Sequence, residues 1–274
     1  MIPLEDNFND VIGKAQRGLK LSDEQLSIAA AVGVEQITRV KGGEFDEPVL
    51  RKLAPALKLA ANSLVAHGRK AWRPKPSGEI PGFAAFNTPF EDMTVNSYLV
   101  WDQTSKEAVA FDTGATAGPM LQAAKERGLA IKLILLTHTH LDHVMDLARL
   151  KKETGANSCV GADENFSDAE SFQAGKTFMI GSLKIQTRQT AGHARGGITY
   201  LVSGLSRPLA VVGDALFASS MGGGQISYDQ ALSTNRQNLF TLPDDTVVCP
   251  GHGPLTTIGE EKLNNPFYPE FQKP

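Results

Sequence analysis

The residues best suited to chemistry in this 274-residue chain are five of its six histidines and two aspartates. Four of these seven stand in the run Thr137-His138-Thr139-His140-Leu141-Asp142-His143, directly after a mostly apolar stretch at 131–136. Neutral imidazole and carboxylate groups are the ligands that suit zinc and neighbouring first-row metals. Because every second residue of an extended segment points to the same side, His138, His140 and Asp142 are predicted to share one direction. His143 is predicted to point in another direction. Such a cluster is a poor choice for a core or a plain turn, so it predicts a metal site.

Three later segments each add one residue of the same kind. They are Gly192-His193, Gly213-Asp214 and Pro250-Gly251-His252-Gly253. Each follows a stretch that reads as a strand, and glycine gives the backbone room to turn there. Each segment alone is weak evidence, but in this order after the first cluster they predict that His193, Asp214 and His252 complete the site.

The elements that must position these groups alternate between strands and helices from about residue 83 onward. Short apolar runs indicate buried strands, and longer amphipathic runs indicate helices. This interleaving favours an α/β or α+β fold with layered sheets. The predicted strands are 95–101, 108–111, 131–136, 177–180, 183–190, 198–202, 208–213 and 246–249, and the predicted helices are 117–127 and 228–240.

The first seventy residues read differently, as helices only. Ser22 and Gln25 form a capping box, and Val34 to Val40 reads as a short helix that ends at Gly42. A further helix is predicted to begin at Pro48 and to close at His67-Gly68, with His67 as a helix-end residue. The stretch 73–82 holds three prolines and two glycines, so it reads as a linker. We therefore predict a helical domain at 1–72, a linker at 73–82 and a catalytic domain at 83–274.

Composition sets the remaining bounds. No run approaches the roughly 20 apolar residues of a membrane span, and the acidic N-terminus does not read as a signal peptide. Cys159 and Cys249 form no close-spaced motif and are interpreted as small buried hydrophobic residues. These features predict a cytoplasmic protein with no membrane partner. Residues 1–75 hold 12 Lys and Arg against 9 Asp and Glu, which is compatible with nucleic acid without requiring it.

The helical part, over about residues 14–66, resembles a phage-repressor-type helix-turn-helix. The resemblance rests on the capped helix, an Ala-rich turn, Gly33-Val34 and the short second helix. It implies that Glu35, Gln36, Thr38 and Arg39 lie on a recognition helix. DNA is thus one possible partner of this region, and the other interpretation is a helical module for packing or for a homodimer.

The order of the histidine and aspartate motifs resembles that of the metallo-β-lactamase superfamily, over roughly residues 83–265. The resemblance implies an α+β fold, the αβ/βα sandwich of that superfamily, here with a small all-helical N-terminal domain. It implies two divalent ions, with zinc as the first choice and iron or manganese as alternatives. The first ion would be held by His138, His140 and His193, the second by Asp142, His143 and His252, and Asp214 would bridge them.

Within that superfamily the chain is similar to the glyoxalase II (hydroxyacylglutathione hydrolase) group. The similarity rests on Gly213-Asp214-Ala215-Leu216-Phe217, the glycines at 222–224 and the ending PGHGPLTTIGEEKLNNPF. It implies a thioesterase in which hydroxide shared by two ions about 3.5–4 Å apart attacks the substrate. Asp142 would also act in catalysis by orienting that hydroxide. The substrate would be a small thioester or ester, and glutathione as its thiol half is left open because only about twenty residues follow His252.

Three other functions stay open. Persulfide dioxygenases resemble the same group and use one iron, which here would be held by His138, His193 and Asp214. A lactonase is a second alternative, since the same hydroxide attacks esters. The third is a regulator in which the helical domain binds DNA and the metal domain senses a ligand.

Overall fold

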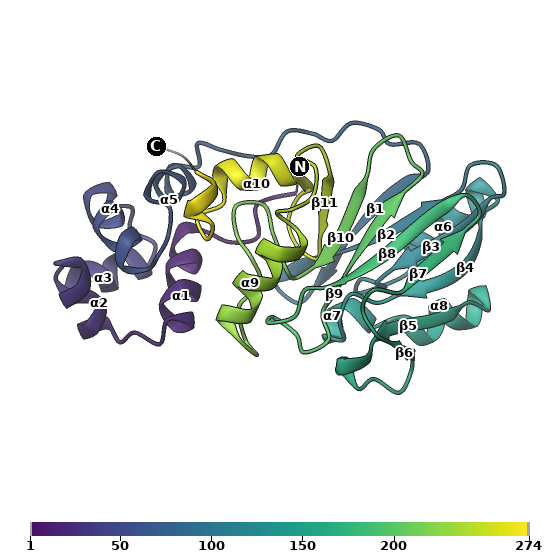
Figure 1. Cartoon of the computed structure of the whole chain (residues 1–274), viewed down its shortest axis with the longest axis horizontal. Coiled ribbons are helices and arrows are strands. Elements are labelled where there is room, and N and C mark those ends of the chain that lie inside the picture. Colours follow the sequence, from purple (N-terminus) through teal and green to yellow (C-terminus); the bar gives the residue numbers. More distant parts are fainter. Residues whose placement is uncertain (1, 273–274) are drawn as a thin grey trace.

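The computed structural model describes residues 2–272, and two six-stranded sheets form its larger part (Figure 1). The first sheet has the order β1-β2-β3-β4-β5-β6, and the second has the order β12-β11-β10-β9-β8-β7. In the first sheet the successive pairs β3–β4, β4–β5 and β5–β6 are parallel. In the second sheet β10 and β11 are parallel. The strands are β1 (Phe83–Phe90), β2 (Met93–Trp101), β3 (Glu107–Phe111), β4 (Ala130–Leu135), β5 (Asn157–Gly161), β6 (Glu170–Phe172), β7 (Thr177–Ile180), β8 (Leu183–Gln189), β9 (Ile198–Ser203), β10 (Leu209–Gly213), β11 (Val247–Pro250) and β12 (Thr256–Thr257).

Alternating side chains build two cores on opposite faces of each sheet. On β3, Val109 and Phe111 pack between the sheets, whereas Ala108 and Ala110 face the helices outside. The outer helices over the first sheet are α6 (Gly118–Arg127) and α8 (Leu147–Thr154). Those beside the second sheet are α9 (Tyr228–Asn238) and α10 (Ile258–Asn264). The order of layers is therefore helix, sheet, sheet, helix, and the predicted αβ/βα sandwich is confirmed.

Within residues 2–72 the chain forms five helices and no strand, and the sequence predicts helices only in this region. They are α1 (Phe8–Gly18), α2 (Asp23–Ala30), α3 (Val34–Lys41), α4 (Glu47–Ala56) and α5 (Ala61–Gly68). The capping box at the start of α2 is present, because Ser22 Oγ accepts from the Gln25 N–H and Gln25 Oε1 accepts from the Ser22 N–H. The DNA-binding role of this region stays a prediction.

The single helix predicted from Pro48 to His67 is wrong, because the chain breaks it between α4 and α5. Lys58 takes a left-handed backbone conformation with φ of 55°. The Ala60 N–H then donates to the Pro266 carbonyl, 2.8 Å away, rather than to a carbonyl of its own helix. A contact with the distant C-terminal segment thus overrides a continuous local pattern.

The five helices pack directly on the sandwich. One apolar cluster contains Ile12 and Leu53 from the helices, Ala210 and Val212 from the outer face of β10, and Tyr268 near the C-terminus. In Figure 1 the helices lie at one end of the molecule, next to α9 and α10. The stretch 73–82 contains no helix or strand, and the predicted division into domains there stays a prediction.

His67 is more than a helix-end residue. It lies in the last turn of α5, as predicted, but its side chain is buried. Its Nδ1 is 2.9 Å from Ser219 Oγ, and its Nε2 is 2.8 Å from the Asp6 carbonyl. His67 therefore ties α5 both to the N-terminal arm and to a loop of the sandwich. Within residues 2–272, no helix is long and apolar enough to cross a membrane.

Candidate metal centre

The seven predicted ligands meet at one edge of the sandwich, where several strands end. His138 and His140 follow β4, and Asp142 and His143 lie on α7 (Leu141–Val144), a single helical turn. His193 stands in the loop between β8 and β9, and the last two ligands follow β10 and β11. The parallel neighbours β10 and β11 end at the same edge of the second sheet, which brings Asp214 and His252 together. The ligands that follow β4 meet them because the two sheets pack face to face. The seven residues are His138, His140, Asp142, His143, His193, Asp214 and His252.

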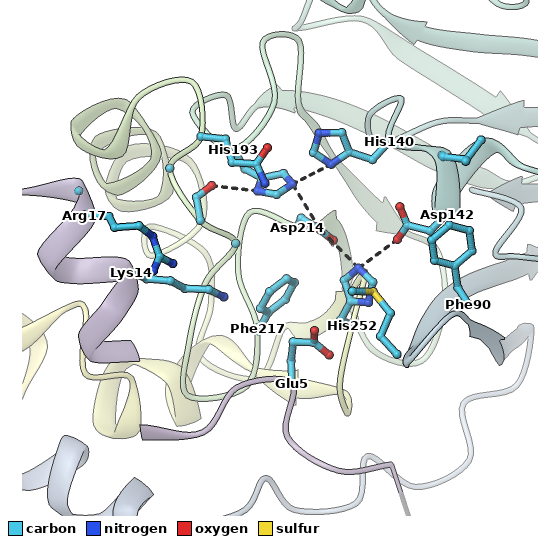
Figure 2. A pocket seen from close by; sticks show the side chains of 17 residues that line it. Glu5, Lys14, Arg17, Phe90, His140, Asp142, His193, Asp214, Phe217 and His252 are labelled. Carbon is cyan, nitrogen blue, oxygen red and sulfur yellow. Dashed lines mark hydrogen bonds and ion pairs between the residues drawn. The ribbon is translucent and has the colours of Figure 1, made fainter. Parts of the chain in front are cut away.

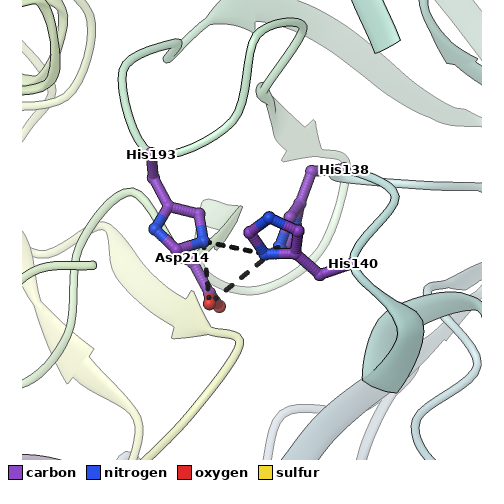
Figure 3. A group of neighbouring side chains, drawn as sticks. All are labelled: His138, His140, His193 and Asp214. Atoms are coloured by element: carbon purple, nitrogen blue, oxygen red, sulfur yellow. Dashed lines mark hydrogen bonds and ion pairs between the residues drawn. The ribbon is translucent and has the colours of Figure 1, made fainter. Parts of the chain in front are cut away.

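The first group comprises His138, His140, His193 and Asp214 (Figure 3). His140 Nδ1 lies 3.0 Å from His138 Nε2 and also 3.0 Å from His193 Nε2. Asp214 Oδ2 is 3.3 Å from His193 Nε2 and 3.9 Å from His138 Nε2. One atom from each residue therefore points to a common centre.

The second group comprises Asp142, His143 and His252. Asp142 Oδ2 is 3.3 Å from His143 Nε2 and 3.2 Å from His252 Nε2. Asp142 thus joins this group and does not point with His138 and His140, because the chain turns into α7 after His140 and the alternation stops. Asp214 lies between the groups, with Oδ1 3.3 Å from His143 Nε2 and Oδ2 3.5 Å from His252 Nε2.

Hydrogen bonds on the outer side of the rings determine which nitrogens face inward. His193 Nδ1 contacts the Gly223 carbonyl at 2.9 Å, and His252 Nδ1 contacts the Thr94 carbonyl at 2.8 Å. A carbonyl only accepts, so both Nδ1 atoms carry a proton. When these rings are neutral, as in a metal ligand, both Nε2 atoms present a lone pair. His143 Nδ1 donates in the same way to Asp112 Oδ2, 2.8 Å away.

His138 follows the same logic through a hydroxyl. The Thr137 hydroxyl donates to Asp112 Oδ2 at 2.8 Å, so its oxygen accepts from His138 Nδ1 at 3.0 Å. The lone pairs of His138 Nε2 and His193 Nε2 then both face His140 Nδ1, which carries at most one proton. His143 Nε2 and Asp214 Oδ1 are buried without a hydrogen-bond partner among residues 2–272. Converging lone pairs and unpaired buried atoms are the surroundings that a cation requires, so the donor set fits two metal ions.

The charges of the cluster lead to the same conclusion. Burial alone would raise the pKa of Asp214, but the neighbouring His252 and His143 hold it well below its usual range. Burial opposes protonation of His252, yet the carboxylates of Asp214 and Asp142 raise its pKa to about 11. Against the same burial, Asp214 and Asp112 raise the pKa of His143 to about 10. The buried carboxylates therefore attract positive charge to this centre, which favours divalent cations.

Two positioning residues were missed at the sequence level. Asp112 directly follows β3 and accepts from His143 Nδ1, from the Thr137 hydroxyl and from the Thr137 N–H at 2.7 Å. Glu164 accepts from the Thr139 N–H and from the Gly196 N–H, so it links the two ligand loops. The motif Asp112-Thr113-Gly114 at a strand end was a signal for the first of these, whereas nothing near Glu164 marked it.

Two glycines leave the space that the ligands occupy. A Cβ at Gly251 would lie 2.1 Å from Asp214 Oδ1 and 2.6 Å from His143 Cε1. A Cβ at Gly222 would lie 2.1 Å from the Asp214 carbonyl oxygen and 2.8 Å from His193 Nδ1. Real Cβ atoms do not approach so closely, so a side chain at either position would displace the cluster.

The centre opens into a pocket of about 800 Å³ (Figure 2). This is the size of sites that hold small organic molecules. His140, Asp142, His193, Asp214 and His252 reach its surface, so a bound molecule contacts both groups. The other lining residues are Glu5, Lys14, Arg17, Gly18, Phe90, Met93, Leu141, Phe217, Gly222, Gly223, Gly224 and Gln225.

The model of the Metallo-beta-lactamase superfamily matches residues 91–252, which include all seven residues of the centre. The chain belongs to the metallo-β-lactamase superfamily. The match begins within the β1–β2 hairpin, so helices α1 to α5 lie outside it.

Relatives within this superfamily carry different names. The chain is 29% identical over 197 residues to hydroxyacylglutathione hydrolase GloC of Haemophilus influenzae, covering 63% of this chain and 92% of that protein. It superposes on the crystal structure of ETHE1 from Myxococcus xanthus with a TM-score of 0.61 and 27% identity, covering 68% and 85% of the two chains. It also superposes on TTHA1623 in a di-iron-bound form, with a TM-score of 0.54 and 27% identity, covering 66% and 99%. Membership of the metallo-β-lactamase superfamily is thus established.

Proposed function

We propose that this protein is a hydrolase that uses two divalent metal ions, and that its substrates are small thioesters. The observation that carries the proposal is the pair of ligand groups with Asp214 between them, because one carboxylate within reach of both groups can bind two ions at once. The similarity to GloC supports a thioester as the substrate class.

The proposed roles follow the two groups. His138, His140 and His193 would hold the first ion, and Asp142, His143 and His252 the second. Asp214 would contact both. When bound, two such ions lower the pKa of a shared water and polarise the substrate carbonyl. The set of His and Asp ligands suits zinc first, with iron and manganese as alternatives.

The chain's own residues would orient the attacking water, hold the ligands in place and exclude other water. Asp142 lies at the pocket surface with Oδ2 directed at His252, where its carboxylate can also orient the attacking water. The outer hydrogen bonds of the histidines, above all those made by Asp112, hold the rings in place. Phe90, Met93 and Phe217 also line the pocket, and their apolar side chains would displace water from the substrate's apolar parts.

A persulfide dioxygenase with one iron is the second candidate, because the superposition on ETHE1 of Myxococcus xanthus favours it. Asp142, His143 and His252 favour the hydrolase. They form a complete second ligand group, which a one-iron enzyme does not need for its metal.

The test is the metal content of purified protein, measured together with hydrolysis of S-lactoylglutathione and oxygen uptake with glutathione persulfide. Two ions per chain with release of the thiol would support the hydrolase. One iron with oxygen uptake would replace it with the dioxygenase. Two ions without thioester hydrolysis, but with lactone hydrolysis, would change the substrate class and keep the centre.

A further inference from the structure

One wall of the pocket comes from outside the part of the chain that matches the superfamily. Lys14, Arg17 and Gly18 on helix α1 line the pocket, as does Glu5 in the arm that precedes it. In Figure 2 helix α1 stands on one side of the centre, and Phe90 stands on the other. A substrate that reaches the ligands therefore lies between a basic wall and an apolar one.

The two basic residues of this wall differ in what they already bind. Lys14 Nζ donates to Asp6 Oδ2 at 2.5 Å and to the Met221 carbonyl at 2.8 Å, and it lies 5.2 Å from the centre of the Phe217 ring. Lys14 thus fixes α1 against the loop that follows Asp214. The positive charge of Lys14 is therefore already paired with the Asp6 carboxylate.

Arg17 has no such partners. Its side chain is exposed, and no hydrogen bond or ion pair to the guanidinium is found within residues 2–272. Arg17 lies one helical turn after Lys14, so both side chains emerge from the same face of α1. A guanidinium offers five N–H donors in a planar fork, which matches a carboxylate with two parallel hydrogen bonds.

The other charges of the pocket allow an anion beside Arg17. Three carboxylates line it, from Glu5, Asp142 and Asp214. The two aspartates lie in the ligand cluster, and the Glu5 side chain lies beside His252 (Figure 2). The negative charge is therefore concentrated at the centre, where two divalent ions would outweigh it, and the pocket as a whole would be positive.

We propose that Arg17 forms a subsite for a carboxylate that the substrate carries away from its scissile bond. This inference rests on the proposed hydrolase function. It assigns the helical region a part in substrate selection, since α1 supplies the subsite and Lys14 holds α1 in position. The carboxylate can belong to the thiol half or to the acyl half of the substrate.

The test compares three thioesters with wild-type protein and with Arg17→Gln. Lactoylglutathione carries carboxylates on the thiol half, succinyl-N-acetylcysteamine carries one on the acyl half, and lactoyl-N-acetylcysteamine carries none. We expect Arg17→Gln to raise KM about 10- to 100-fold for at least one of the charged thioesters, with kcat nearly unchanged, because a charge-assisted hydrogen bond contributes to ground-state binding. The neutral thioester should be unaffected.

The matched control is Arg51→Gln on α4, which removes an equal charge from an exposed position of the helical region outside the pocket. It should leave all three substrates unchanged. An equal effect of Arg17→Gln on charged and neutral thioesters, or no effect on any of them, would overturn the subsite.

Binding without turnover separates this inference from the proposed function. Calorimetric titration of metal-loaded protein with S-methylglutathione and with succinate, neither of which is a thioester, measures binding without turnover. Comparison with Arg17→Gln then separates the subsite from the metal centre. Binding of either anion that weakens in Arg17→Gln and at high salt would support the subsite even if no thioester were hydrolysed. If neither anion bound the wild-type protein, or if Arg17→Gln bound them equally well, the subsite would be excluded even for an active thioesterase.

Discussion

Replacing Gly251 by alanine should remove metal while leaving the fold intact. The added Cβ would lie 2.1 Å from Asp214 Oδ1 and 2.6 Å from His143 Cε1, whereas non-bonded contacts settle near about 3.5 Å. The backbone at Gly251 is not left-handed, so the methyl group itself is the only perturbation. Asp214 and His143 must therefore move by about an ångström, and both are proposed ligands.

The size of the effect follows from the cost of overpacking. Forcing a methyl group into a filled site costs about 1–3 kcal/mol. If the displaced ligands bear that cost, metal affinity falls about 5- to 150-fold. Gly223→Ala is the matched control, because its Cβ meets nothing closer than Gln225 Cγ at 4.0 Å, although Gly223 also borders the pocket.

The assay is metal content per chain after dialysis against a chelator of known affinity, with thermal unfolding of the metal-free proteins measured in parallel. Gly251→Ala should lose metal at chelator concentrations that Gly223→Ala and the wild type withstand, and its metal-free form should melt within a few degrees of theirs. Unchanged affinity for two ions in Gly251→Ala would refute the arrangement of Asp214 and His143 described above.

Three other predictions concern the ligands, their support and the contact between the helices and the sandwich. His252→Ala should lower metal content from two ions to one per chain, and retention of two would show that His252 is not a ligand. Asp112→Asn should weaken metal binding about 10- to 100-fold, because an amide cannot replace a carboxylate that accepts from both His143 and Thr137, and competition with a chelator measures this. His67→Leu should lower the free energy of unfolding at pH 7.5 by about 1–3 kcal/mol, since it leaves buried partners unbonded. Burial lowers the pKa of His67, so the unfolded chain binds its proton first, and stability from this group is lost as pH falls below about 6.5. The gap between wild type and variant in denaturant titrations should therefore narrow with acidity, and a constant gap would contradict this.

The ligand cluster was predictable from sequence because its members are marked locally. His138 and His140 stand two residues apart after an apolar run, and His193, Asp214 and His252 each follow a glycine at a strand end. A glycine stands beside these ligands because the chain must turn sharply where each ligand follows its strand. Their convergence in two groups is the part that the structure adds.

The rest of the pocket could not be predicted because it depends on contacts between distant segments. Glu5 and Arg17 lie more than a hundred residues before the first ligand, and no spacing rule connects them to it. The break at Lys58 has the same origin, since the C-terminal segment binds the backbone of Ala60. Local patterns record which residues face a core but not which distant element covers them.

The apolar cluster that α1 to α5 share with β10 and the C-terminal segment also has a thermodynamic consequence. The helices and the sandwich bury apolar side chains in the same cluster. Unfolding one part alone would expose the apolar surface of the other to water, which raises the free energy of the partly unfolded state. We expect a single cooperative calorimetric transition, and two resolved transitions would show that the parts are independent. A shared core also makes the helices poor candidates for truncation. Deleting them would uncover apolar surface on the sandwich, and aggregation of the shortened protein would then say nothing about its catalysis.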